Sequence, residues 1–371
     1  MKTIIMLGVL LGLLLVAVFG LRSFIQRKII KKSKKLIKSG GISQVEKLYI
    51  GGIRQYILIE GKSKDLPICL FLHGGPGAPF PFGVSSRSLF PEITEHYLAV
   101  YYDQRGAGKS YSKAIDPKSM NIEQIMNDIH ELVDYLREKF HQDQVMLVGM
   151  SWGTVLGTEL IKRYPEKFYT YVGISQVVND AESQKLAKSW LAEKAKRTGD
   201  QRALHVLNEL GEPPYVGKKD EQLDKLISKY KGDLYEDRST KKPNLFLLVR
   251  GAFISPDYTL LDLWKALITG AKFSLLESKD LQMEIAKTNY LETVPTVNIP
   301  VYFIQGKHDK TTNYELAKQF FNCIAAPKGK EFITLEQSAH YPNEADFNVI
   351  LHKLVELAIS KDKTHFSTEQ S

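Results

Sequence analysis

The chain has 371 residues, 43% hydrophobic and 25% charged, which are the fractions of a folded globular protein rather than a disordered one. Its formal net charge of +8 is confined to one end, because residues 1–38 hold nine of the 50 Lys and Arg residues and no acid. From position 39 onward, 41 basic residues face 42 acidic ones, a net charge of −1. We therefore expect no nucleic-acid partner.

An uninterrupted apolar run, IIMLGVLLGLLLVAVFGL, occupies residues 4–21. As a helix it is about 27 Å long, close to the ~30 Å thickness of the hydrocarbon core of a bilayer. We therefore predict a transmembrane anchor over residues 1–21. A cleaved signal peptide is the alternative, but no small-x-small cleavage site follows the run and basic residues come directly after it.

The basic juxtamembrane segment, residues 22–41, begins RSFIQRKIIKKSKKLIK and mixes large apolar residues with cations. This mixture favours a helix on an anionic membrane surface, with residues 22–38 contacting anionic lipid, and a solvated charged spacer is the alternative. Eight of the nine basic residues lie after the apolar run. Since positive charge stays on the cytoplasmic side, we expect a single-pass membrane protein with its catalytic domain in the cytoplasm.

Short apolar runs alternate with longer amphipathic stretches over residues 42–175 and again over 298–361. This alternation predicts an α/β fold with a mostly parallel central sheet and helices on both faces. The first two strands share a short turn and are expected to form an antiparallel pair at the edge of the sheet. The predicted strands are 47–50, 55–60, 67–72, 98–102, 145–149, 169–174, 301–305 and 331–335, and the predicted helices are 122–140, 154–164, 313–323 and 344–359.

The alternation is interrupted by residues 176–297, which are rich in Lys, Glu, Leu and Asp and show mostly helical periodicity. We predict a helical lid over the carboxyl edge of the sheet, where open α/β sheets bind ligands. The polar residues 362–371 are expected to be a flexible tail. The two cysteines, Cys69 and Cys323, lie in no metal-binding spacing, so no metal is expected.

The sequence GMSWG, residues 149–153, follows a predicted buried strand and precedes a predicted helix. This context is that of a nucleophile elbow, in which Ser151 occupies a sharp turn and Gly149 and Gly153 remove side chains that would clash. The elbow exposes the Ser151 hydroxyl at a helix N-terminus, where the helix dipole favours developing negative charge. We therefore predict Ser151 to be the catalytic nucleophile.

A nucleophilic serine needs a general base and an orienting acid. Three histidines follow the last predicted strand. His352 lies in a predicted helix and His365 in the tail, whereas His340 lies in a loop at the strand end and is therefore the predicted base. Asp309 follows the preceding strand and completes the chain order Ser, Asp, His. The alternative role for Asp309 is to cap the helix that begins near residue 313.

Acyl transfer also needs two backbone N–H donors aimed at the developing oxyanion. Trp152, directly after the nucleophile, supplies one of them. The second is expected from the loop HGGPG, residues 73–77, in which Pro76 has no N–H. Gly75 is therefore the predicted donor, with Gly74 as the alternative and His73 as a supporting residue.

The stretch DQRGAGKS, residues 103–110, resembles half of a phosphate-binding loop and suggests a nucleotide-binding switch protein. The full pattern G-x-x-x-x-G-K-[ST] needs a glycine where Asp103 stands, so we expect no nucleotide. Instead, Asp103 and Arg105 are predicted to brace a tight turn that supports the catalytic loops.

The set HGGPG, DQRGAGKS, GMSWG, GKHD (306–309) and SAH (338–340), in this order, resembles the α/β-hydrolase superfamily, and within it the proline iminopeptidase-like branch. The resemblance covers residues 45–175 and 298–360. It implies an α/β-hydrolase fold, hydrolysis through an acyl-serine intermediate, release of N-terminal residues (often proline) from short peptides, and no cofactor.

The sequence departs from that branch at Met150, where iminopeptidases usually carry glycine. The branch holds the free amine of its substrate with lid acids, and Glu182, Glu193 and Asp257 are candidates that match no known pattern. Because the lid also contains aromatic residues, a carboxylesterase or lipase acting on acyl esters is the alternative to an aminopeptidase acting on small peptides. A non-catalytic, membrane-tethered binding protein is the alternative from another class.

Overall fold

One eight-stranded sheet organises the catalytic part of the chain, in the order β1-β2-β4-β3-β5-β6-β7-β8. The computed structural model describes residues 1–243 and 245–368, so residues 369–371 of the predicted tail lie outside the described residues. The strands are β1 (Ile42–Ile50), β2 (Ile53–Gly61), β3 (Ile68–Leu72), β4 (Leu98–Asp103), β5 (Val145–Met150), β6 (Phe168–Ile174), β7 (Val301–Gly306) and β8 (Lys330–Leu335).

The sheet is parallel from β4 to β8, and the prediction of an antiparallel pair at one edge is confirmed. β1 pairs antiparallel with β2, and β2 pairs antiparallel with β4. Successive side chains of a strand point to opposite faces, so a strand that is apolar at every position must be covered on both sides. In β3, Leu70 and Leu72 belong to the core on one face, whereas Cys69 and Phe71 belong to the core on the other.

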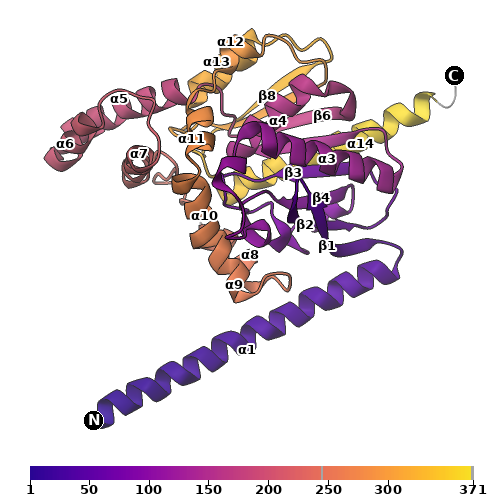
Figure 1. Cartoon of the computed structure of the whole chain (residues 1–371), viewed down its shortest axis with the longest axis horizontal. Helices are drawn as coiled ribbons and strands as arrows, with labels where there is room; N and C mark the ends of the chain where they lie inside the picture. Colours follow the sequence, from indigo (N-terminus) through magenta and orange to yellow (C-terminus); the bar gives the residue numbers. More distant parts are fainter. Residues whose placement is uncertain (244, 369–371) are drawn as a thin grey trace.

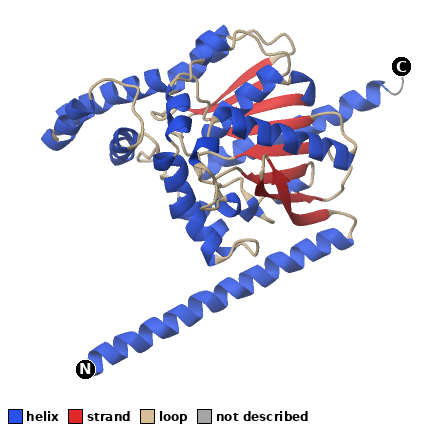
Figure 2. Ribbon diagram, viewed as in Figure 1, coloured by secondary structure: helices blue, strands red, loops and turns tan. Residues whose placement is uncertain are grey.

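Helices cover both faces of the sheet, as predicted (Figure 2). Side chains of α3, α4 and α13 pack on one face, and those of α2 and α14 pack on the other. The Asn121 side chain caps the first turn of α3 by accepting a hydrogen bond from the Gln124 N–H. The bounds are α2 (Pro91–Thr94), α3 (Ile122–Phe140), α4 (Trp152–Arg163), α13 (Tyr314–Cys323) and α14 (Glu344–Thr368), with short 3-10 turns η1 (Val84–Ser86), η2 (Gly108–Ser110), η3 (Pro117–Ser119) and η4 (Pro165–Lys167).

The insert between β6 and β7 is helical, which confirms the predicted lid. Helices α5, α6 and α7 share a small hydrophobic cluster of their own and project as an arm from the body (Figure 1). Of the remaining lid helices, α8 to α11 lie along one side of the body, and α12 lies beside α13 (Figure 1). The lid comprises α5 (Asp180–Thr198), α6 (Gln201–Leu210), α7 (Lys218–Lys229), α8 (Leu245–Ile254), α9 (Leu260–Trp264), the π-helical turns η5 (Lys265–Thr269) and η6 (Phe273–Glu277), α10 (Gly270–Lys272), α11 (Lys279–Ala286) and α12 (Tyr290–Thr293).

The first helix, α1 (Lys2–Lys38), is continuous through the apolar run and the basic segment. Its N-terminal half projects beyond the body (Figure 1), whereas Ile29 and Ser33 in its C-terminal half are buried. Among the described helices, this one alone is long and apolar enough to cross a membrane, and an N-terminal signal sequence would meet the same criterion.

Candidate active site

Three predicted residues come together at the carboxyl ends of parallel strands. Ser151 follows β5, Asp309 lies three residues beyond β7, and His340 lies in the loop after β8. Parallel strands end at the same edge of the sheet, so residues far apart in the chain meet there. Gly306 lets the last two loops touch, because a side chain at Gly306 would lie 2.0 Å from the carbonyl oxygen of Ala339.

Ser151 occupies a sharp turn with φ 51° and ψ −118°, a conformation that costs energy for a non-glycine residue. Its N–H donates to the Ile174 carbonyl of the neighbouring strand at 2.9 Å. The flanking glycines allow this turn through close approach: a Cβ on Gly149 would lie 2.5 Å from the Gly153 carbonyl oxygen, and one on Gly153 would lie 2.2 Å from the Leu72 carbonyl oxygen. The backbone of the elbow therefore packs directly against the end of β3.

His340 and Asp309 form a buried pair, with His340 Nδ1 3.0 Å from Asp309 Oδ2. The Asp309 carboxylate also accepts hydrogen bonds from the Thr311 and Thr312 backbone N–H groups, the Thr312 hydroxyl and the Gln305 amide. Asn313, rather than Asp309, caps α13. Burial alone would raise the pKa of Asp309, but its partner His340 and these donors outweigh burial and lower that pKa, so the carboxylate stays ionised.

The pKa of His340 is shifted in the opposite direction. Burial lowers it, but the adjacent Asp309 charge and hydrogen bond outweigh burial, and the net effect is a raised pKa. A histidine oriented through Nδ1 presents its Nε2 as a proton acceptor, which is what a general base requires. Two other candidates lie elsewhere: His352 is exposed on α14, and the side chain of His365 lies outside the described residues.

Ser151 and His340 line the same cavity of about 280 Å³, together with Gly75, Met150 and Tyr341. Among the described residues no hydrogen bond joins the Ser151 hydroxyl to His340. In unliganded serine hydrolases this contact is often long and tightens when substrate binds.

The two predicted oxyanion donors face the same space. Gly75 is exposed to the cavity in a left-handed conformation with φ 114°, which glycine tolerates best. In the part of the chain that the structure describes, the backbone N–H groups of Gly75 and Trp152 donate no hydrogen bond. Two free donors beside Ser151, one at the N-terminus of α4, can stabilise an oxyanion. A Cβ on Gly74 would lie 3.4 Å from that of Ser151, so Gly74 packs against Ser151 itself.

Gln104, which the sequence analysis did not single out, joins three of the motifs. Its side-chain amide donates to the His73 carbonyl at 3.1 Å and accepts from the Trp152 indole N–H at 2.9 Å. Its backbone N–H donates to His73 Nε2 at 3.2 Å. His73 Nδ1 lies 2.7 Å from the Gly74 carbonyl oxygen, and burial lowers the pKa of this histidine to about 4, so it is neutral. Gln104 therefore couples the loop of Gly75 to Trp152.

Asp103 and Arg105 stabilise the turn formed by residues 103–110 and its neighbours. The buried Asp103 carboxylate accepts from the Val84 and Lys109 backbone N–H groups and, at 2.5 Å, from the lid residue Tyr258. Burial raises the pKa of Asp103 to about 6 despite these donors. Arg105 forms a buried ion pair with Asp128 of α3 at 2.7 Å. The Lys109 ammonium, which a phosphate loop would aim at a nucleotide, instead bonds Asp262 of the lid.

Replacing Gln104 by leucine should lower kcat by about 10-fold to 100-fold with a smaller change in KM, because the two predicted oxyanion donors would lose their common support. Steady-state kinetics on an aminoacyl arylamide measure the changes in kcat and KM separately. Gln142→Leu is the matched control, since the Gln142 side chain bonds the backbone of Leu66 and Ile68 at the start of β3 and lines neither cavity that contains Ser151. An equal loss of kcat in both variants would mean that Gln104 contributes only to stability.

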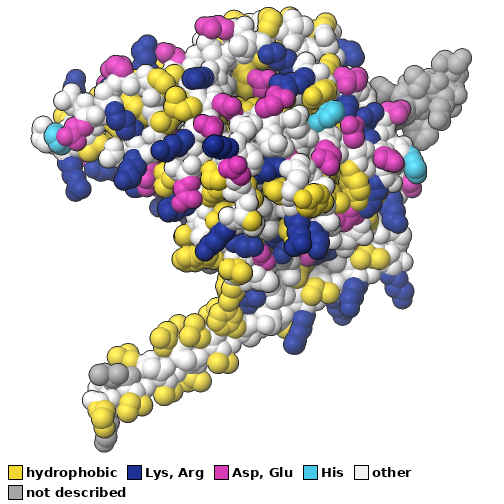
Figure 3. All heavy atoms as spheres, viewed as in Figure 1, with side chains coloured by type: hydrophobic (Ala, Val, Ile, Leu, Met, Phe, Trp, Pro, Cys, Tyr) yellow, Lys and Arg dark blue, Asp and Glu magenta, His cyan; other side chains and the backbone are white. Residues whose placement is uncertain are grey.

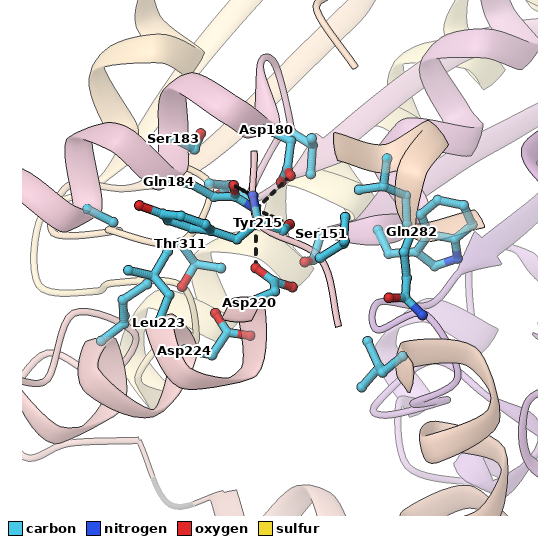
Figure 4. Close-up of a pocket in the computed structure, with 18 of the residues that line it drawn as sticks. Ser151, Asp180, Ser183, Gln184, Tyr215, Asp220, Leu223, Asp224, Gln282 and Thr311 are labelled. Carbon is cyan, nitrogen blue, oxygen red and sulfur yellow. Dashed lines mark hydrogen bonds between the residues drawn. The ribbon is translucent and has the colours of Figure 1, made fainter. Parts of the chain in front are cut away.

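A group of lid carboxylates faces Ser151 across a second cavity of about 140 Å³. Asp180, Asp220 and Asp224 line this cavity together with Ser151 and Gly75 (Figure 4). Among the described residues no Lys, Arg or His forms an ion pair with any of the three acids. Lys310 also lines this cavity but, among the described residues, forms no ion pair with the three acids, so their carboxylates can attract a further cation.

One glutamine holds two of these acids in place. The Gln184 amide nitrogen lies 3.0 Å from Asp180 Oδ2 and 3.2 Å from Asp220 Oδ1, and it also bonds the Tyr215 carbonyl at 3.1 Å (Figure 4). The Gln184 carbonyl accepts from the Tyr215 N–H at 2.6 Å, so the amide is fixed with its nitrogen toward the acids. Neutral donors of this kind orient carboxylates without neutralising their charge.

The three acids raise one another's pKa. Burial raises the pKa of Asp180 to about 7, with a further contribution from Asp224, and burial together with Asp180 raises that of Asp220 to about 7. Asp224 is exposed to the cavity, yet desolvation by the surrounding protein, together with the neighbouring Asp220, raises its pKa to about 7. The cluster is therefore only partly ionised at neutral pH until a cation enters.

The lid acids named from the sequence lie elsewhere. Glu182 pairs with Lys185 on the surface, Glu193 is exposed on α5, and Asp257 pairs with Arg87. The signal that could have found the cluster is the spacing of Asp220 and Asp224, which places two acids one turn apart on the face of α7 that also carries buried Leu223 and Ile227.

Among the described residues no group of His, Cys, Asp and Glu side chains is arranged to hold a metal ion. The carboxylates of the acidic cavity are hydrogen-bond acceptors that suit an organic cation. A primary or secondary ammonium group has the hydrogen-bond donors that carboxylates accept.

Comparison with known proteins shows the same architecture. A family model described as the alpha/beta hydrolase fold matches residues 67–346. Over 302 residues the chain is 32% identical to a probable aminopeptidase of Bacillus subtilis, a match that covers 81% of this chain and 92% of that protein. Over 111 residues it is 36% identical to a proline iminopeptidase of Arabidopsis thaliana, which covers 29% of this chain and 26% of the plant protein.

Solved structures of low sequence identity share the fold. A proline iminopeptidase-related protein of Thermus thermophilus has a TM-score of 0.55 at 18% identity, and covers 85% of this chain and 98% of its own. An epoxide hydrolase of Vigna radiata has a TM-score of 0.52 at 21% identity, with coverages of 86% and 98%. Because enzymes with different reactions share this fold, these two likenesses carry no information about substrate.

Proposed function

The chain belongs to the α/β-hydrolase family, in its proline iminopeptidase-like branch, and from this premise we propose that it is a membrane-anchored serine aminopeptidase. It would remove N-terminal residues from short peptides that carry a free amine. The Bacillus relative, named as a probable aminopeptidase, supports a peptide substrate. Beyond that likeness, we propose which residues catalyse the reaction, which acids bind the amine of the substrate, and that α1 anchors the protein in the membrane.

The observation that carries the proposal is the cavity that Ser151 shares with the acids Asp180, Asp220 and Asp224, which form no ion pair among the described residues. An α-ammonium group placed among these carboxylates would hold the N-terminal residue of a peptide with its carbonyl near the serine. Charge-assisted hydrogen bonds of this kind are stronger than neutral ones in a desolvated cavity. A fatty acyl ester has no group that needs such a site.

In the proposed reaction, His340 accepts the proton of Ser151 as its hydroxyl oxygen attacks the substrate carbonyl. Asp309 orients His340 and stabilises the imidazolium that forms. The free N–H groups of Gly75 and Trp152 support the oxyanion of the tetrahedral intermediate. His340 then protonates the leaving amine, and a water molecule that gives its proton to His340 hydrolyses the acyl-serine.

We propose further that α1 crosses the bilayer through residues 4–21, with the catalytic body on the cytoplasmic side. The basic residues that follow the apolar run support this orientation. Residues 22–38 form the C-terminal half of α1 and present many of their cations to solvent, which supports contact with anionic lipid.

The test compares a prolyl or alanyl arylamide with its N-acetylated analogue. We expect acetylation to lower kcat/KM by about 100-fold or more, because it removes the charge that the acids would bind. In the double variant Asp220→Asn/Asp224→Asn, this preference should shrink to within a few-fold, chiefly through a higher KM for the free amine. Glu182→Gln is the matched control, since Glu182 is a lid acid paired with Lys185 outside the cavity.

The double variant is expected to keep its fold. The folded-state pKa of Asp220 lies above its unfolded value, so ionisation costs stability as pH rises from about 4 towards 7. Above pH 7 the neutral amides should leave thermal stability equal or higher. If wild-type protein cleaves blocked amides or acyl esters as well as free-amine substrates, the esterase alternative replaces the aminopeptidase. If it cleaves neither, the non-catalytic alternative stands.

A further inference from the structure

The lid carries an exposed apolar face that the catalytic site does not use. Leu260, Leu261, Trp264, Leu267 and Ile268 lie on α9 and η5, and their exposed fractions range from 39% for Leu267 to 63% for Leu261. Their spacing of one, three and four residues places them on one side of the helix, whereas Asp262 and Ala266 between them are buried. Large apolar side chains gathered on one exposed face mark an interaction surface.

This apolar face, hereafter the α9 face, lies where the apolar half of α1 leaves the body. Arg22 is the first charged residue after the apolar run, and its guanidinium donates to the Phe253 carbonyl at 2.7 Å and the Tyr258 carbonyl at 2.8 Å. Gln26 donates to the Ser255 carbonyl at 2.8 Å. The lid is thereby tied to α1 at the level where a membrane span would emerge from the bilayer.

Leu260 follows Tyr258 by two residues, so the α9 face begins directly beside this junction. Figure 1 places α8 and α9 next to α1, and Figure 3 shows hydrophobic side chains along the projecting half of α1 and at the neighbouring edge of the body. The two apolar surfaces are therefore adjacent. A bilayer that surrounds residues 4–21 would have its headgroup region at the height of this face.

The composition around the face suits a lipid headgroup layer. A groove of about 860 Å³ borders it, and its wall combines Leu261 and Trp264 with the cations Arg54, Lys113 and Lys265. Among the described residues Arg54 and Lys113 form no ion pair. Tryptophan and flanking cations are the residues that favour the membrane interface, where the ring contacts acyl chains and the charges contact phosphates.

We propose that the α9 face is a second membrane contact, which dips into the headgroup region of an anionic bilayer beside the α1 anchor. The proposal rests on the proposed anchoring of α1. It adds that the lid itself touches the bilayer, so that the body contacts the membrane at a second place beside α1.

Quenching of tryptophan fluorescence by spin-labelled lipid tests this contact. Full-length protein is reconstituted in vesicles of phosphatidylcholine and phosphatidylglycerol, with or without a phosphatidylcholine that carries a nitroxide near the top of its acyl chain. The chain has three tryptophans, Trp152, Trp190 and Trp264, and Trp152 is buried. We expect lipid quenching in the wild type and in Trp190→Phe, and loss of the quenched component in Trp264→Phe. Trp190→Phe is the matched control, since Trp190 lies on the projecting arm.

Flotation of the vesicles separates this proposal from the anchor. Protein that floats with vesicles but shows the same quenching in Trp264→Phe as in the wild type keeps the anchor and overturns the α9 contact. Protein that does not float overturns both. A third outcome is that the α9 face contacts a second copy of the protein instead of lipid. Trp264→Cys in a Cys323→Ser background tests for it, because a disulfide between copies in vesicles would make the face a protein interface and would overturn the lipid contact. The background is needed because Cys323 is the exposed native cysteine, whereas Cys69 is buried.

Discussion

Ser151→Ala is expected to lower kcat for a free-amine arylamide by about 10⁴-fold or more, down to the residual catalysis that oxyanion donors and binding alone provide. The reason is that no other group in the shared cavity is placed on a strained elbow at a helix N-terminus. Steady-state turnover measures the loss. Covalent labelling by a fluorophosphonate should disappear in the same variant, because the labelled atom would be the Ser151 oxygen.

Ser183→Ala is the matched control for this experiment. Ser183, on α5, contributes another hydroxyl to the wall of the same cavity. Its removal should change kcat by no more than about two-fold, as is usual for a substitution that touches no reacting group. Turnover in purified Ser151→Ala that stays within ten-fold of the wild type would contradict the assignment of the nucleophile.

Asp309→Asn is expected to lower kcat by about 10³-fold to 10⁴-fold, with little change in KM. Asparagine keeps the shape of the side chain but removes the charge that orients and stabilises protonated His340. Asp346→Asn is the control, since Asp346 accepts a hydrogen bond from Ser338 at 2.5 Å and supports the His340 loop from α14 without contacting His340. A comparable loss in the control would assign the effect to the loop rather than to the ion pair.

The pH dependence of activity further separates loss of the Asp309–His340 ion pair from a general disturbance of the His340 loop. In the wild type the pKa of His340 is raised from its usual 6.5, so neutral His340 and activity are lost as pH falls through a value above 6.5. In Asp309→Asn, burial acts with less opposition, and the acidic limb of kcat/KM should move to lower pH. An acyl ester without an amine should be used, because the acids Asp180, Asp220 and Asp224 titrate near 7.

Much of the fold was predictable because its determinants are local. Strands that are buried on both faces must be apolar at successive positions, and the runs at 98–102 and 145–149 differ from β4 and β5 by one residue at the end. The amphipathic stripe of 122–140 matches α3 to the residue. The bounds of the lid helices were not predictable, since their apolar residues serve partly the arm cluster, partly the body and partly an exposed face.

The residues of the candidate site likewise divide into those with local determinants, which could be predicted, and those without. GMSWG and HGGPG are contiguous motifs in which neighbouring residues impose the backbone shape, so Ser151, Trp152 and Gly75 could be named from the sequence. Gln104 could not, although it stands inside a recognised motif, because its role depends on where His73 and the Trp152 ring lie. Asp180, Asp220 and Asp224 were missed for a stronger reason: nothing in a chain rich in acids distinguishes three that will face one cavity.

By itself, the sequence determined an α/β-hydrolase framework, the order Ser, Asp, His along it, and an apolar N-terminal helix long enough to span a membrane. Each of these depends on residues close together in the chain, or on the rule that parallel strands end at one edge. Only the tertiary structure decided which carboxylates share a cavity with Ser151 without forming an ion pair among the described residues, and that the lid binds Arg22 and exposes Trp264 near α1. Desolvation and charge compensation depend on every atom around a group, whatever its distance in sequence, and are therefore properties of the packed molecule.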